Sequence, residues 1–132
     1  MPGAIFVDSG AFYAAIDRRD AWHAEAVAGF DAIRREERKL FTSNLVVAEA
    51  HGLTLRRLGR VIAARWLMSL PNNVVFQANE DHAQALALLA RYQDQDFSYT
   101  DAVSFAIMER LGIRTAFAFD ADFRIYGFEV IP

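Results

Sequence analysis

The chain has 132 residues, a formal net charge of −3 and 54% hydrophobic residues. This length suits one domain around one buried core, and so hydrophobic a composition excludes an intrinsically disordered chain. Cysteine is absent, which excludes a disulfide scaffold, thiolate zinc sites and cysteine nucleophiles. We therefore expect a single domain over residues 1–132, in a reducing compartment such as the cytoplasm.

The first predicted element is a strand over Ala4–Val7 that ends at Asp8. Because Asp8 interrupts the apolar run and no basic residue precedes it, this segment does not resemble a secretory signal peptide. No uncharged stretch approaches the roughly 18 residues that a membrane-spanning helix needs. We expect a cytoplasmic protein that does not enter a membrane.

Segments with helical periodicity alternate with short apolar runs along the rest of the chain. The predicted helices are Ser9–Ile16, Ala21–Arg35, Asn44–Leu58, Val61–Met68, Asp81–Tyr92 and Tyr99–Leu111, and the further strands are Leu40–Phe41, Val74–Phe76, Thr115–Phe119 and Phe128–Ile131. Ser43 or Asn44 can cap the helix that follows, and Gly112 suits a helix C-terminus. The alternation predicts an α/β fold, a three-layer α/β/α domain with a mainly parallel central sheet.

Two aspartates directly follow predicted strands, Asp8 after the first and Asp120 after Thr115–Phe119. Parallel strands place their carboxyl ends at one edge of the sheet, where ligands bind in this architecture. Either residue could instead serve only as the N-cap of the helical segment that follows it.

Two further acids lie on predicted helices. Glu49 shares a helix side with Leu45 and Leu53, which predicts an inward carboxylate. The alternative for Glu49 is a buried salt bridge, for example to Arg56.

Asp101 shares a helix face with Phe105 and Met108, which also favours an inward orientation. The alternative is a capping box, because Ser98 stands three residues before Asp101.

As a set, these four acids indicate a cation site. Two carboxylates about 4 Å apart repel by roughly 4 kcal/mol at an effective dielectric of about 20, so clustered acids must raise their pKa values or share a cation. Mg²⁺ and Mn²⁺ prefer oxygen ligands, and such a site can hydrolyse a phosphodiester. The sequence contains no GxGxxG, P-loop, HExxH or Gly-x-Ser-x-Gly motif that would indicate another chemistry.

Positive charge gathers between Arg34 and Arg65, where eight basic and three acidic residues give a balance of +5 and leave −8 for the rest of the chain. One region could favour phosphate while another favours cations. The alternative is a pair of solvated helix faces.

Four segments resemble the acidic motifs of PIN-domain ribonucleases: FVDSGAFYA, VVAEAHGL, YTDAVSFAIM and FAFDADFRIYGFEVI. Their order and approximate spacing are similar to those of the small VapC-like toxins of toxin–antitoxin pairs, and the resemblance covers almost the whole chain. Gly10 departs from the pattern, since asparagine or another small polar residue is common there.

The resemblance implies an acidic pocket that binds Mg²⁺ or Mn²⁺. Carried over by position, its members are Asp8, Glu49, Asp101 and Asp120, with Asp122 as an accessory ligand and Ser9 and Thr100 as adjoining hydroxyl residues. Either hydroxyl could hydrogen-bond a metal-bound water or simply cap a turn.

The family further implies endonucleolytic cleavage of single-stranded or structured RNA, a homodimer, and inhibition by a cognate antitoxin whose tail occupies the active-site groove. Glu49 would ligate the metal or orient the attacking water, and Arg56, Arg57 and Arg60 would contact RNA phosphates. The alternatives are a nuclease of RNA maturation or DNA processing and a non-catalytic RNA-binding module. A receiver-like phospho-switch fits poorly, because Lys39 is the sole lysine.

Overall fold

The computed structural model describes residues 3–70 and 73–132, and within them five strands form one parallel sheet. The strands are β1 (Ile5–Val7), β2 (Leu40–Ser43), β3 (Val74–Val75), β4 (Thr115–Phe117) and β5 (Glu129–Ile131). The helices are α1 (Ser9–Ile16), α2 (His23–Arg35), α3 (Asn44–Leu58), α4 (Arg60–Met68), α5 (Asn79–Arg91), α6 (Tyr99–Leu111) and α7 (Asp122–Tyr126).

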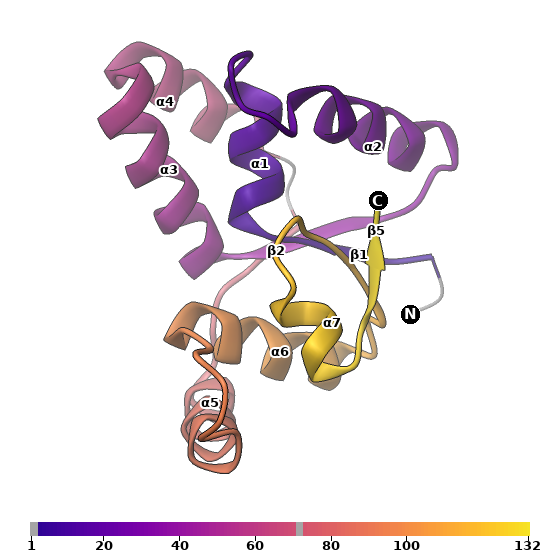
Figure 1. The fold of residues 1–132 in the computed structure, drawn as a ribbon, viewed down its shortest axis with the longest axis vertical. Coiled ribbons are helices and arrows are strands. Elements are labelled where there is room, and N and C mark those ends of the chain that lie inside the picture. Colours follow the sequence, from indigo (N-terminus) through magenta and orange to yellow (C-terminus); the bar gives the residue numbers. More distant parts are fainter. Residues whose placement is uncertain (1–2, 71–72) are drawn as a thin grey trace.

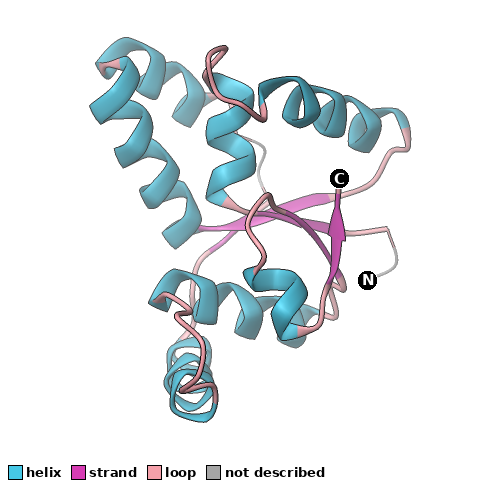
Figure 2. Cartoon of the chain, viewed as in Figure 1, coloured by secondary structure: helices cyan, strands magenta, loops and turns pink. Residues whose placement is uncertain are grey.

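Helices cover both faces of the sheet (Figure 1). The helices α1, α2, α3 and α4 lie on one side of it, and α5, α6 and α7 lie on the other. Figure 2 shows the strands in magenta between these two helical layers in cyan. The predicted three-layer α/β/α fold with a parallel sheet is therefore confirmed.

Three helices, α1, α3 and α6, have the predicted bounds. The Ser43 hydroxyl accepts a hydrogen bond from the Val46 N–H at 3.1 Å and so caps α3. Gly112 ends α6 in the left-handed conformation, with φ of 69°, as glycine readily does. No helix within residues 3–70 and 73–132 is both long and apolar enough to cross a membrane.

The strand β4 is shorter than predicted. It ends at Phe117 rather than Phe119, because its pairing with both neighbours ends there, opposite Val7 of β1 and Ile131 of β5. Asp120 therefore lies three residues beyond the strand end instead of directly after it.

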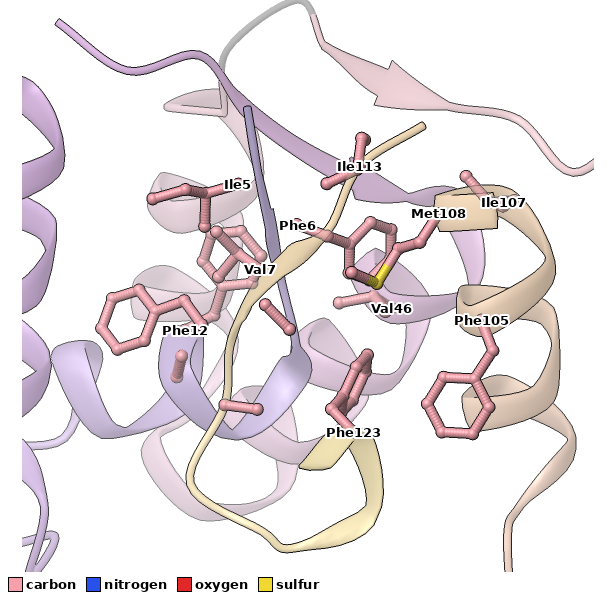
Figure 3. Close-up of a cluster of buried hydrophobic side chains, with 14 of the residues drawn as sticks. Ile5, Phe6, Val7, Phe12, Val46, Phe105, Ile107, Met108, Ile113 and Phe123 are labelled. Atoms are coloured by element: carbon pink, nitrogen blue, oxygen red, sulfur yellow. The ribbon is translucent and has the colours of Figure 1, made fainter. Parts of the chain in front are cut away.

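The core surrounds β1, whose three residues are fully buried. Figure 3 shows Phe12 and Val46 from the α1 and α3 layer and Phe105 and Phe123 from the α6 and α7 layer around this strand. A central parallel strand covered on both faces is expected to be a continuous apolar run, as Ile5–Val7 is.

The strand order β3-β2-β1-β4-β5 contains one reversal. The chain moves from β1 to β2 and β3 toward one edge, and then returns to place β4 on the other side of β1. At such a switch point the loops that leave two adjacent strands part in opposite directions and open a crevice at their carboxyl ends. The residues that follow β1 and β4 border this crevice.

Candidate active site

Asp8 lies at the carboxyl end of β1 and is only 4% exposed. It occupies the N-cap position of α1, yet its side chain makes no capping hydrogen bond. The N-cap alternative therefore does not account for this carboxylate. A buried carboxylate without a counter-charge is unfavourable, so its surroundings decide what it can do.

Three aspartates at the same edge lie within reach of one cation. One carboxylate oxygen from each of Asp101, Asp120 and Asp122 lies within 4.8 Å of the others. Asp120 also accepts a hydrogen bond from the Asp122 backbone N–H at 3.0 Å, which fixes the turn into α7. Asp120 thus belongs both to this turn and to the carboxylate cluster.

Asp101 takes part in the capping box that the sequence offered as an alternative. The Ser98 hydroxyl accepts from the Asp101 N–H, and Asp101 Oδ2 accepts from the Ser98 N–H, both at 3.0 Å. Asp101 can serve both the capping box and a cation site, because a carboxylate has a second oxygen and four acceptor positions in all.

The prediction that Glu49 faces the core is wrong. The buried positions of α3 are Val46, Ala50 and Thr54, one residue further along the chain than predicted, and Glu49 is exposed. Its carboxylate nevertheless reaches α1, where it accepts a hydrogen bond from the Ser9 hydroxyl. The Glu49–Arg56 salt bridge is not formed among the described residues.

Two of the acids, Asp8 and Asp101, have raised pKa values. Burial raises the pKa of Asp8 well above its ordinary value, and the charges of Asp120, Asp101 and Glu49 raise it further. Burial also raises the pKa of Asp101 to about 6, with Asp120 and Asp122 adding to the shift and the Ser98 hydrogen bonds opposing it. All five carboxylates therefore belong to one electrostatic unit.

The side chains of the remaining candidates, Thr100 and three arginines, form no hydrogen bond or ion pair with the five acids within the described residues. Within the described residues the Thr100 hydroxyl donates no hydrogen bond. The Thr100 carbonyl accepts one from the Ser104 hydroxyl. Arg56 and Arg57 stand in the last turn of α3, about 10 Å along the helix axis from Glu49. Arg57 lies 5.3 Å above the Tyr13 ring, and Arg60 begins α4. These arginines thus form no ion pair with the acid cluster.

The donor set fits a hard divalent cation. It consists of carboxylate oxygens, the ligands that Mg²⁺ and Mn²⁺ favour. Among the described residues no arginine, lysine or histidine forms an ion pair with any of the five acids. The raised pKa values of Asp8 and Asp101 mean that a nearby positive charge would favour the ionised forms of these two carboxyls.

The chain is similar to characterised nucleases along most of its length. It is 36% identical over 132 residues to the 23S rRNA-specific endonuclease VapC20 of Mycobacterium tuberculosis, an alignment that covers 97% of this chain and 98% of the relative. It is 28% identical over 117 residues to the VapC ribonuclease of Archaeoglobus fulgidus, covering 84% of this chain and 74% of the relative.

Solved structures give the same result. The crystal structure of Mycobacterium tuberculosis VapC20, a sarcin–ricin loop cleaving toxin, matches with a TM-score of 0.86 at 33% identity, covering 97% of this chain and 99% of that one. FitAcB from Neisseria gonorrhoeae matches with a TM-score of 0.71 at 15% identity, covering 97% and 96%, which shows the fold alone. A family model of the PIN domain matches residues 5–129. The chain belongs to the PIN-domain family.

Proposed function

We propose that the protein is a metal-dependent endoribonuclease that acts as the toxin of a type II toxin–antitoxin pair. The observation that carries this proposal is the buried Asp8 at the switch point, facing the charges of Asp120, Asp101 and Glu49. The relatives named as a 23S rRNA-specific endonuclease and as a VapC ribonuclease support the same activity.

The acids have separate roles in this proposal. Asp8, Asp101 and Asp120 hold Mg²⁺ or Mn²⁺, with Asp122 as a further ligand. Asp101, Asp120 and Asp122 form the 4.8 Å group, and Asp8 lies outside it. When bound, the ion supplies a more acidic water and stabilises negative charge on the phosphodiester. Glu49, held by the Ser9 hydroxyl, orients the attacking water and accepts its proton. In the reaction the water oxygen bonds to phosphorus, one P–O ester bond breaks, and the leaving oxygen takes up a proton.

For the substrate we propose single-stranded or structured RNA, with the sarcin–ricin loop of 23S rRNA as the first to test, because a relative similar over nearly its whole length is described as cleaving it. Arg56, Arg57 and Arg60 are exposed and available to RNA phosphates. For the partners we propose a second copy of the chain and an antitoxin whose tail lies in the acidic groove.

The test is cleavage of purified 23S rRNA in Mn²⁺, Mg²⁺ or EDTA. We expect cleavage by the parent only with metal, and a loss of at least about 100-fold in rate for Asp8→Asn and Asp101→Asn, the scale of removing a group that acts directly in catalysis. The matched control is Asp31→Asn, an exposed aspartate on α2 that pairs with Arg34, which should cleave like the parent. Unchanged cleavage by Asp8→Asn would falsify the proposal.

A growth experiment separates the toxin role from RNA maturation. Expression of the chain alone should arrest growth, and co-expression of its genomic neighbour should relieve the arrest. If the chain cleaves RNA in vitro but its expression alone does not arrest growth, the result would favour a nuclease of RNA maturation.

A further inference from the structure

A stacked aromatic pair lies next to the acid cluster. The rings of Trp22 and Phe119 are 5.4 Å apart between centroids and 16° from parallel. Phe119 immediately precedes Asp120, so their Cα atoms are only about 3.8 Å apart. Trp22 is 52% exposed, so a large aromatic surface lies open beside the site.

Buried rings support this pair from beneath. Phe119 packs on the edge of Phe117 at 5.8 Å, and Phe117 in turn contacts Phe30 at 4.9 Å. Phe117 is fully buried in β4, so the row of rings connects the exposed tryptophan to the core.

The backbone of Trp22 is held on both sides. Its N–H donates to Asp20 Oδ1 at 2.8 Å, and its carbonyl accepts from the Ala26 N–H at 2.9 Å in the first turn of α2. A ring whose backbone is already fixed loses little conformational freedom when a ligand stacks on it.

The pair joins the acid cluster to the turn between α1 and α2, whose residues 17–20 carry two aspartates and two arginines. On one side stand the acids, which repel phosphate in the absence of a cation. On the other, within four residues of Trp22, the turn between α1 and α2 exposes Arg18 and Arg19, and Arg19 approaches Asp17 no closer than 3.8 Å. A neutral contact is the kind that can hold a nucleotide close to the acids, while the arginines can hold a phosphate further along the strand.

We propose that Trp22 and Phe119 form a stacking platform for an unpaired nucleobase of the RNA substrate, next to the phosphodiester that is cleaved. Unpaired bases stack on aromatic side chains because every base has a π-face. The occupant class rests on the proposed function, since it assumes that RNA enters the acidic site.

Binding without cleavage provides the first test. The chain contains two tryptophans, and the other, Trp66, packs on Phe12. In a Trp66→Phe protein the fluorescence therefore reports Trp22. When this protein also carries Glu49→Gln, which removes the proposed proton acceptor and leaves the proposed aspartate ligands, a short oligoadenylate in Mn²⁺ should quench this fluorescence with saturation, whereas an abasic ribose–phosphate oligomer of equal length and charge should not. Equal quenching by both oligomers, or none by either, overturns the platform.

Substitutions provide the second test. Trp22→Leu keeps an apolar side chain but removes the ring, and should weaken oligoadenylate binding about tenfold while leaving abasic-oligomer binding and the salt dependence unchanged. Trp22→Phe should retain most of the affinity. The control is Leu86→Ala, an equally exposed apolar residue on α5, which should bind like the parent. Parent-like oligoadenylate binding by Trp22→Leu overturns the proposal. If that variant does not fold, the affinities of Trp22→Phe and the parent for oligoadenylate are each divided by their affinities for the abasic oligomer. The two ratios should be similar and well above one, and ratios near one overturn the platform.

These results separate the platform from the nuclease activity. Base-dependent quenching by a protein that cleaves no RNA in Mn²⁺ would contradict the proposed function and support the platform. If the parent cleaves RNA, Trp22→Leu has the same KM and no quenching is seen, the proposed function is supported and the platform is overturned. The exposed Trp22 would then be a contact for a protein partner.

Discussion

The Asp101→Asn substitution removes one charge from the acid cluster while it keeps the side-chain shape and an oxygen that can accept from Ser98. Burial and the neighbouring acids raise the pKa of Asp101 from 3.8 to about 6, and each unit corresponds to about 1.4 kcal/mol, so the upper limit is about 3 kcal/mol. Because Asp101 is partly exposed, solvent screening reduces this to about 1 to 2 kcal/mol. We expect the metal-free variant to be more stable than the parent by that amount at neutral pH.

The sign follows from proton binding. Between about pH 4 and pH 6 the folded parent holds a proton on Asp101 that the unfolded chain has released, so the stability of the parent falls as the pH rises through this window. The asparagine variant lacks this titration. The gain in stability of Asp101→Asn over the parent should therefore be smallest below about pH 4 and fully present above about pH 7.

Urea unfolding in EDTA across this pH range measures the difference directly. The opposite control is Asp81→Asn, because Asp81 is 1% exposed and accepts two hydrogen bonds from Arg110 at 2.8 Å. The pKa of Asp81 is lowered, mainly by Arg110, so its carboxylate stabilises the fold above about pH 4, and removing it should lower stability by about 2 to 3 kcal/mol. The electrostatic account of the cluster would be refuted if the change in the free energy of unfolding for Asp101→Asn did not vary with pH. It would also be refuted if that change had the same sign as the change for Asp81→Asn.

Three other outcomes follow from described contacts. Free Mn²⁺ at about 100 times its dissociation constant should stabilise the parent by about 2.7 kcal/mol in thermal unfolding and should not stabilise Asp8→Asn, whereas equal stabilisation would place the ion elsewhere. Ser9→Ala removes the hydrogen bond to Glu49 and should lower RNA cleavage by about 10- to 100-fold with little change in unfolding temperature; full activity would show that Glu49 needs no support. Gly29→Ala would place a Cβ 2.4 Å from the buried Phe117 ring, so urea unfolding should show a loss of about 1 to 3 kcal/mol despite the better helix propensity of alanine.

The fold could be predicted because its signals are local. Apolar runs such as Ile5–Val7, caps such as Ser43 and the glycine at 112 depend on a few neighbouring residues, and α1, α3 and α6 have the predicted bounds. The parallel sheet then follows from the alternation of strands and helices.

The details of the site depend on how distant segments pack, and the sequence pattern did not contain them. The face that Glu49 shares with Leu45 and Leu53 predicts a buried side chain, but α3 is rotated so that small and medium residues, Ala50 among them, face the core. The position of Asp120 depends on the length of β1 through strand pairing. The grouping of Asp122 with Asp101 requires the turn into α7, which the short D-x-D sequence only suggests.

The strand order also sets a sequence of events during synthesis. The central strand β1 is made first, but one of its two neighbours, β4, is made only when the chain has passed Phe117. A ribosome-bound chain that already contains Asp8 and Glu49 also contains β2, but it lacks the pairing of β1 with β4 and the aspartates at 120 and 122. The acid cluster cannot assemble while most of the protein is being translated, so a nuclease built this way stays inert beside the RNA of the ribosome that makes it until its last strands emerge.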